Sequence, residues 1–189
     1  EPDHPQFGKL ITCHNPAHLA KRISALGTLT QASPADASIR LSDLKPLDSN
    51  KAMFEAAREL LRDPHGWLYV YGPPGNGKTL VLKALCNPLA LQGFEPVVYL
   101  RFTHLVNLMR DAYTERQKSG PLEGLGYVER FDRLKRIPVL ALDEVDKARA
   151  TQLGEEFRFE FLDERYQQAI NRESITLFAS NSPPTDFPA

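Results

Sequence analysis

Residues 72–79 read GPPGNGKT, which matches the pattern G-x-x-x-x-G-K-[ST] at every fixed position. Small residues let the backbone curl, so that its N–H groups converge on a phosphate in front of a helix N-terminus. Lys78 would add a cation for the β- and γ-phosphates, and the Thr79 hydroxyl would ligate Mg²⁺. We therefore predict ATP and Mg²⁺ as cofactors, with a nucleotide site built from Gly72, Pro73, Pro74, Gly75, Asn76, Gly77, Lys78, Thr79 and Leu80.

A second group of polar residues follows the apolar run VLAL at 139–142. Asp143 ends this run, at the carboxyl edge where an open α/β sheet binds ligands, and is assigned to the metal, through water. Glu144 is predicted to be the general base that orients and polarises an attacking water. The alternative for both acids is a helix cap or a solvated turn, while Asp146 and Lys147 are interpreted as surface residues.

Asn181 follows the apolar run ITLFAS. If that strand lies between the strands that carry the glycine loop and Asp143, the amide would reach the γ-phosphate or the attacking water. An asparagine after a strand is also a common turn residue. The predicted catalytic residues are thus Glu144, Lys78 and Asn181, and the predicted metal residues are Thr79 and Asp143.

The elements that position these side chains alternate between strands and helices. The strands are continuous apolar runs, which is typical of strands buried on both faces, so we predict a parallel sheet with helices on both sides. Strands are expected at 66–71, 96–102, 138–144 and 174–180, and helices at 50–63, 78–92, 104–117, 126–137 and 152–173. Asn50 is the expected N-cap of the first of these helices.

Composition limits the class of protein. The chain has 189 residues, 42% hydrophobic and 25% charged, with a formal net charge of −1. It should be a soluble protein, and any contact with nucleic acid must come from a local basic patch. No run is long enough to span a membrane and no signal peptide is recognisable, so we expect no membrane partner and a reduced, cytoplasmic location. Cys13 and Cys86 give no disulfide framework, and Cys86 is expected in the core.

The three motifs GPPGNGKT, VLALDE and LFASN, in this order and at these intervals, resemble those of the AAA+ ATPases. The subgroup they resemble is the DnaC/DnaI/IstB-like class of helicase loaders and transposition helper ATPases. In that class, a segment similar to DERY, here at 163–166, precedes a strand that ends in Ser-Asn or Thr-Asn. The resemblance covers about residues 41–189.

The resemblance implies a P-loop NTPase three-layer αβα sandwich. The family's strand order is 5-1-4-3-2, of which this chain can supply 1-4-3-2. The family's arginine finger and second sensor arginine follow the Asn181 strand, so we expect residues 41–189 to be an AAA+ domain that lacks its C-terminal part. For this reason, ATP hydrolysis is expected to be weak in isolation. Residues 1–40 are expected to be an irregular segment or linker.

The predicted function is an ATP-hydrolysing AAA+ switch in DNA replication that loads a replicative helicase. The alternatives are a transposition helper ATPase and a P-loop kinase of a small molecule. The expected partners are the helicase or transposase, single-stranded DNA, and further copies of the protein in an AAA+ oligomer.

Three other groups of residues were considered. Cys13 and His18 resemble half of an N-terminal zinc module of the family, but the companion C-x-x-C is absent, and an irregular remnant with a free thiol is preferred. Arg165 is interpreted as an ion-pair partner of Glu164 or Asp163, or as an arginine that reaches a neighbouring subunit's nucleotide. Basic residues that could contact DNA are interleaved with acids and are preferred as solvated helix faces: Arg101, Arg110, Arg116, Lys118, Arg130, Arg133, Lys135 and Arg136.

Overall fold

A single parallel sheet forms the centre of the molecule in the computed structural model, which describes residues 36, 38–108, 134–147 and 152–186. Its strands are β1 (Gly66–Tyr71), β2 (Val97–Arg101), β3 (Val139–Asp143) and β4 (Ile175–Ser180). They pair in the order β1-β4-β3-β2, and every pair is parallel. The predicted order 1-4-3-2 is confirmed, and β4 lies between β1 and β3.

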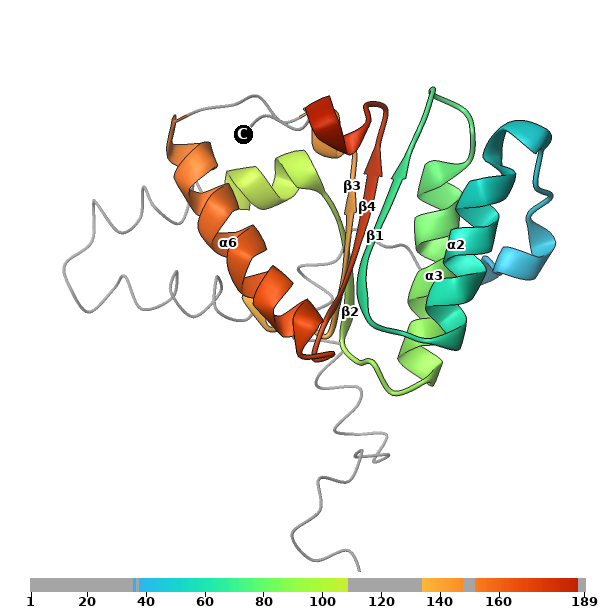
Figure 1. Ribbon diagram of the computed structural model, residues 1–189, viewed down its shortest axis with the longest axis horizontal. Coiled ribbons are helices and arrows are strands. Elements are labelled where there is room, and N and C mark those ends of the chain that lie inside the picture. The colour runs from blue at the N-terminus through green and yellow to red at the C-terminus, as the bar shows by residue number, and fades with distance from the viewer. Residues whose placement is uncertain (1–35, 37, 109–133, 148–151, 187–189) are drawn as a thin grey trace, which may run out of the picture.

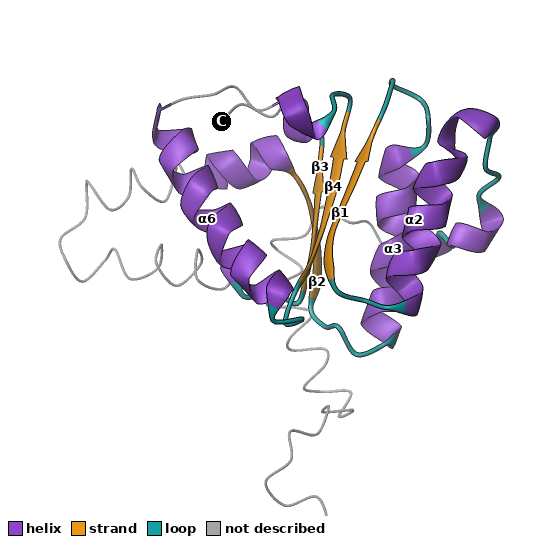
Figure 2. Ribbon diagram, in the orientation of Figure 1, coloured by secondary structure: helices purple, strands orange, loops and turns teal. Residues whose placement is uncertain are grey.

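Helices cover both faces of this sheet (Figure 1). Helices α2 (Lys51–Arg62) and α3 (Lys78–Leu91) lie on one face, and α6 (Gln152–Ile170) lies on the other, together with the helical residues 102–108 (Figure 2). The prediction of a three-layer αβα sandwich is therefore confirmed. The strand predicted at 96–102 ends at Arg101, because Phe102 already belongs to the following helix.

The alternation of side chains along each strand divides the interior into two hydrophobic cores. On β4, Leu177 packs into the core under α2 and α3, and the next residue, Phe178, packs into the core under α6. The strand β3 follows the same rule, with Ala141 on the first side and Leu142 on the second. All residues of β3 and β4 are buried, which explains why both strands read as continuous apolar runs.

The register brings the carboxyl ends of all four strands to one edge of the sheet. Tyr71 of β1 pairs with Ser180 of β4, and Arg101 of β2 pairs with Asp143 of β3. The loops that follow these residues carry the predicted site. Two of these loops contain a short 3₁₀ helix: η4 (Val145–Lys147) follows β3, and η5 (Pro184–Asp186) follows β4.

Asn50 occupies the N-cap position of α2, as predicted, but its side chain makes no capping hydrogen bond to that helix. Its Oδ1 accepts a hydrogen bond from the Leu47 N–H at 2.7 Å, and its Nδ2 donates to the Asn76 carbonyl at 3.0 Å. The side chain therefore closes the 3₁₀ helix η3 (Asp48–Asn50) and supports the glycine loop.

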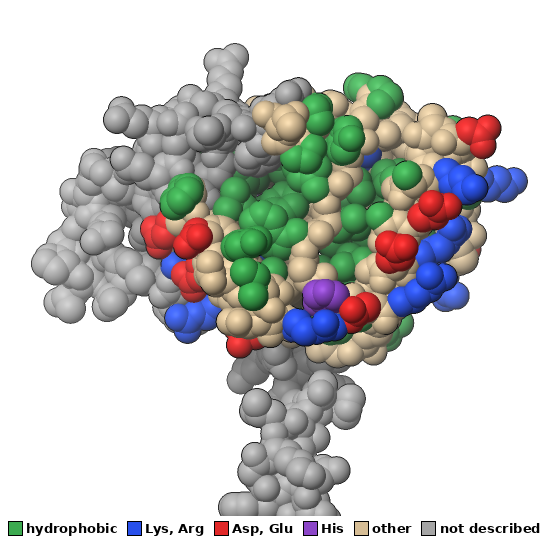
Figure 3. Space-filling view, viewed as in Figure 1, with side chains coloured by type: hydrophobic (Ala, Val, Ile, Leu, Met, Phe, Trp, Pro, Cys, Tyr) green, Lys and Arg blue, Asp and Glu red, His purple; other side chains and the backbone are tan. Residues whose placement is uncertain are grey.

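β1 is an edge strand, and among the described residues no fifth strand pairs with it. Figure 3 shows the molecule from the same side as Figure 1, with hydrophobic side chains in the middle of the view and charged side chains along the lower and right-hand rim. Trp67 and Tyr71 of β1 are 40% and 55% exposed, and the Trp67 ring meets Tyr166 of α6 edge-on at 5.6 Å. No helix in the described part of the chain has the length and hydropathy needed to cross a bilayer.

Arg165 on α6 is fully buried, and both sequence interpretations of it are wrong. Its guanidinium donates to Thr176 Oγ1 at 2.8 Å and to the carbonyls of Lys135, Ile137 and Ile175 at 2.8–3.0 Å. It pairs with neither Glu164 nor Asp163 in these contacts, and burial leaves it no route to another subunit. Burial lowers the pKa of Arg165 to about 10, so the side chain still carries its charge at neutral pH.

Other predictions for charged residues and thiols have mixed outcomes. Lys135 does not lie on a solvated helix face, which was the preferred prediction, because its side chain is buried and its ammonium pairs with Glu164 (2.8 Å) and Glu160 (3.2 Å). Cys86 is half-buried and packs against the core under α2 and α3, and burial raises the pKa of its thiol to about 12. The zinc candidates Cys13 and His18 lie outside the described residues, as do five of the basic residues, Arg110, Arg116, Lys118, Arg130 and Arg133.

Candidate nucleotide site

The glycine loop leaves β1 and curls back into α3. Gly72, Gly75 and Gly77 have φ values of 144°, 84° and 91°, which residues with a Cβ rarely adopt. At Gly72 a Cβ would also lie 2.5 Å from Asn76 Nδ2, so the Asn76 side chain would have to shift to admit it. The Gly72 N–H donates to the Ser180 carbonyl at 3.3 Å, which ties the loop to the end of β4.

Lys78 is the first residue of α3, and its ammonium is held by the loop itself. It donates to the carbonyls of Gly72 (2.7 Å) and Pro73 (2.9 Å) and to Asn76 Oδ1 (3.2 Å). Burial lowers the pKa of Lys78, and the negative charges of Asp143 and Asp146 oppose that shift. The loop therefore fixes the position of the ammonium before any ligand binds. An incoming anion would replace the carbonyl oxygens as its hydrogen-bond partner.

Asp143 is buried at the end of β3 and is held by three donors. Its Oδ2 accepts hydrogen bonds from Thr79 Oγ1 at 2.7 Å and from Tyr99 Oη at 2.6 Å. Its Oδ1 accepts from the Glu144 N–H at 2.8 Å. The contact with Thr79 joins the two residues predicted to serve the metal, across 64 positions of sequence.

Tyr99 was not predicted to belong to the site. It lies on β2, and burial is the main cause that raises the pKa of its phenol, so it stays a hydrogen-bond donor. The Lys83 ammonium lies over the Tyr99 ring, 5.1 Å from the ring centroid, and forms a salt bridge with Asp36 at 3.0 Å. The only signal in the sequence was a tyrosine within an otherwise apolar strand. That signal does not indicate which neighbouring residue its hydroxyl contacts.

Glu144 has a φ of 57°, a conformation that is uncommon for a residue with a side chain. Its carboxylate pairs with Lys147 Nζ at 2.5 Å, and its second oxygen lies 3.9 Å from Arg101 Nε. The hydrogen bond to Glu144 raises the pKa of Lys147. The predicted base is thus paired with a lysine in this structure.

Asn181 lies just beyond β4 and is held by Asp146. The backbone N–H of Asn181 donates to Asp146 Oδ1 and its Nδ2 donates to Asp146 Oδ2, both at 3.0 Å. Ser180 Oγ adds a longer contact to the same carboxylate at 3.4 Å. Burial alone would raise the pKa of Asp146, but the hydrogen bonds from Asn181 and Ser180 outweigh it and lower the pKa.

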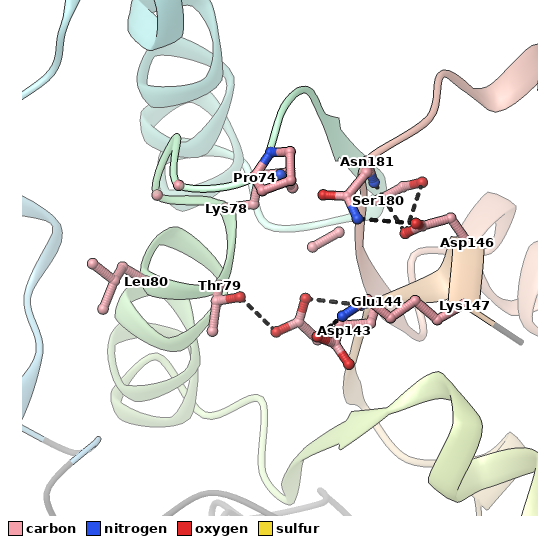
Figure 4. Close-up of a pocket in the computed structure, with 13 residues that line it drawn as sticks. Pro74, Lys78, Thr79, Leu80, Asp143, Glu144, Asp146, Lys147, Ser180 and Asn181 are labelled. Atoms are coloured by element: carbon pink, nitrogen blue, oxygen red, sulfur yellow. Dashed lines mark hydrogen bonds and ion pairs between the residues drawn. The ribbon is translucent and has the colours of Figure 1, made fainter.

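One cavity of about 410 Å³ joins these groups (Figure 4). Six of the predicted nucleotide residues line it, and Gly72, Pro73 and Asn76 lie behind it as partners of Lys78. Asp146 and Lys147 are exposed, as predicted, but they also line the cavity, which the prediction missed. The sequence feature that could have indicated this is the spacing D-E-x-D-K, because one 3₁₀ turn after Glu144 returns Asp146 and Lys147 to the end of the strand. The lining consists of Pro74, Gly75, Gly77, Lys78, Thr79, Leu80, Asp143, Glu144, Asp146, Lys147, Ala179, Ser180 and Asn181.

The residues present fit a nucleotide with Mg²⁺. The cavity volume is within the usual range for small-molecule sites. The hydroxyl of Thr79 and the carboxylate of Asp143 are the hard oxygen ligands that Mg²⁺ takes, usually beside phosphate and water. The described residues contain no cluster of three or more His, Cys, Asp or Glu side chains that could hold an ion alone.

A glycine loop before a helix, an acid at the end of the third strand and the order β1-β4-β3-β2 define a P-loop nucleoside-triphosphatase fold. The model of the family "ATPase family associated with various cellular activities (AAA)" matches residues 68–186, which is more than half of the chain. The chain belongs to this AAA family, as its motifs predicted. Membership in an ATPase family suggests nucleotide hydrolysis.

Solved structures that share the fold include DnaI and the replication initiator DnaA. A structure of DnaI has a TM-score of 0.62 at 21% identity and covers 84% of this chain and 80% of its own. The initiator DnaA bound to AMPPCP and single-stranded DNA has a TM-score of 0.62 at 22% identity, with 82% of this chain and 44% of its own covered. Domain III of Thermotoga maritima DnaA has a TM-score of 0.64 at 17% identity, with 84% and 61% covered.

These likenesses show the fold alone. The chain spans less than half the length of the DnaA structure with AMPPCP. Among curated protein sequences, none matches this chain.

Proposed function

We propose that this chain binds ATP with Mg²⁺, hydrolyses it, and uses the two states to act on a replicative helicase. One observation carries the proposal. A single cavity brings together Lys78, Thr79, Asp143, Glu144 and Asn181 from the loops after three neighbouring strands. These are the cation, metal ligands, base and polar amide that phosphoryl transfer to water requires.

Each residue has a separate task. The Lys78 ammonium would exchange the carbonyls of its own loop for phosphate oxygens, and the loop's N–H groups would add further donors. Thr79 and Asp143 would hold Mg²⁺, which supplies neutralisation of the charge on the β- and γ-phosphates. Glu144 would leave Lys147 and accept a hydrogen bond from the attacking water, while Asn181 would orient the same water.

Hydrolysis is preferred over phosphoryl transfer to a small molecule. P-loop kinases usually close several arginines over the phosphates, and no arginine is among the described residues that line this cavity. An acid and an amide at adjacent strand ends instead suit the activation of water.

The role in replication rests on resemblance. The sequence motifs are similar to those of the DnaC/DnaI/IstB-like class, and DnaI and DnaA share the fold. In this proposal ATP binding orders an oligomer of the protein on its helicase, and hydrolysis releases it. Single-stranded DNA would be a further ligand, bound mostly through phosphates and weakened by salt.

The chemical part is tested with two variants of the full-length protein. Glu144→Gln should bind ATP as the wild type does but lose hydrolysis by about 100-fold or more, because the base is gone. Lys78→Ala should lose ATP binding itself. Glu173→Gln and Lys45→Ala, at exposed positions outside the cavity, are the matched controls and should behave as the wild type. Normal turnover by Glu144→Gln would remove that residue from the base role.

The biological part needs the partner. Capture of the replicative helicase by the Glu144→Gln protein in ATP, and not in ADP, would support a loader. Capture of a transposase instead would replace the loader with a transposition helper. Failure to bind either client, together with transfer of the γ-phosphate to a small acceptor, would favour the kinase alternative.

A further inference from the structure

Asp146 holds the side chain of Asn181 in one orientation. Its two oxygens each accept a hydrogen bond from Asn181, one from the backbone N–H and one from Nδ2, both at 3.0 Å. Because a carboxylate only accepts hydrogen bonds, the amide nitrogen must face Asp146. The amide oxygen then points away from Asp146, toward the glycine-loop side of the cavity (Figure 4).

This orientation decides what the amide can offer to the cavity. One N–H of the amide is engaged by Asp146, and the amide oxygen, which is an acceptor, faces the glycine-loop side of the cavity. A water molecule has protons to donate to this oxygen, whereas a phosphate oxygen has none and would be repelled by it. The amide is therefore oriented to hold a water.

Within the described part of the chain, no other hydrogen bond of the Asn181 side chain would keep the amide from turning over. The residue is partly exposed, just past the strand end, and its side chain donates a hydrogen bond to Asp146. Asp146 is itself placed by the 3₁₀ turn η4, and Ser180 contacts the same carboxylate.

We propose that Asp146 is a positioning residue, which fixes the amide of Asn181 so that its oxygen faces the water that attacks the γ-phosphate. This inference rests on the proposed ATPase function and on the role given there to Asn181. It adds a third acid to the site, one that acts through Asn181.

Steady-state kinetics of the full-length protein tests the inference. Asp146→Ala should lower kcat about tenfold, the effect of one hydrogen bond in the transition state, with the KM for ATP changed less than about twofold. Asp146→Asn should not restore kcat, because its NH₂ group would face one of the two donors of Asn181. Asp163→Asn, an exposed acid on α6 outside the cavity, is the control and should leave kcat unchanged.

A double variant separates positioning from an independent effect. If Asp146 acts through Asn181, then Asp146→Ala combined with Asn181→Ala should be no slower than Asn181→Ala alone. Losses that multiply would overturn the inference, and so would a normal kcat in Asp146→Ala. A normal kcat in Asn181→Ala would overturn the role of Asn181 as well.

A measurement without nucleotide gives a second, independent readout. The Asn181 side-chain NH₂ signal in the ¹⁵N NMR spectrum can be assigned from its loss in Asn181→Ala. In the wild type its chemical shift should be that of a hydrogen-bonded amide. In Asp146→Ala it should move to the position of a solvent-exposed asparagine. An unchanged signal would overturn the inference whether or not the protein hydrolyses ATP.

Discussion

The carboxylate of Asp143 has two hydroxyl donors on the same oxygen, and one of them comes from a strand that sequence motifs do not point to. Thr79 lies within the glycine loop pattern, so its role could be predicted from spacing alone. Tyr99 could not, because its contact depends on the pairing of β2 with β3 and on a side chain that crosses to the neighbouring strand end. Fixed spacing identifies residues of one loop, and it says little about partners brought by another strand.

At this scale we predict that Tyr99→Phe destabilises the protein through Asp143. Loss of the hydroxyl leaves a buried carboxylate with one donor fewer, and a hydrogen bond to a charged group is worth about 1.5–3 kcal/mol. Urea unfolding of Tyr99→Phe, Asp143→Ala and the double variant should give a coupling free energy of about this size. Tyr71→Phe, at an exposed position, should cost less than about 0.5 kcal/mol. A coupling near zero would refute the contact.

At the scale of elements, Arg165 joins three segments that the sequence alone could not bring together. It reaches from α6 to the start of β4 and to the carbonyls of residues 135 and 137, which end a helical turn before β3. A cation suits the negative end of a helix, which helps to explain a buried arginine that donates to a hydroxyl and to backbone carbonyls. Sequence reasoning assumed that an arginine beside acids on a helix would pair with them.

We predict that Arg165→Met destabilises the protein by roughly 3 kcal/mol or more, because several buried acceptors lose their donors at once. Arg165→Lys should restore little, since one ammonium cannot serve acceptors spread around a planar guanidinium. Thermal and urea unfolding measure both.

The control is Arg172→Met, which removes an exposed arginine paired with Asp63 and should cost at most about 1 kcal/mol. If Arg165→Met unfolds at the same urea concentration as this control, the hydrogen bonds of Arg165 do not stabilise the fold as described.

At the scale of the whole molecule, the strand order could be predicted from the family resemblance, and the three layers could be predicted from the pattern of strands and helices along the chain. Continuous apolar runs predict a buried parallel sheet, and alternation with helices predicts the two outer layers. Periodicity does not say which strand lies beside which, and the order 1-4-3-2 came from the motifs of the family. The site was predicted where the motifs are local, at Lys78, Thr79, Asp143, Glu144 and Asn181, and missed where a turn or a neighbouring strand brings the residue in, at Asp146, Lys147 and Tyr99.

The two hydrophobic cores share the sheet, so we predict that they unfold together. Leu177→Ala should cost about 2–5 kcal/mol and Phe178→Ala about 3–5 kcal/mol, although these neighbouring residues face opposite cores. Both should shift one common transition, seen alike by far-UV circular dichroism and by the fluorescence of Trp67, the single tryptophan.

The control is Leu91→Ala, at the exposed end of α3, which should change the unfolding free energy by less than about 0.5 kcal/mol. Separate transitions in the two core variants would mean that the two faces of the sheet are independent units.

The contacts from Asp36 through Lys83 and Tyr99 to Asp143 have a thermodynamic consequence. Linkage between two sites is reciprocal, so any effect of the nucleotide on Asp36 is matched by an equal effect of Asp36 on the nucleotide. A nucleotide that holds the carboxylate in place would then also hold the segment at residue 36. Conversely, a partner that pulls on that segment would change the affinity for the nucleotide without touching it.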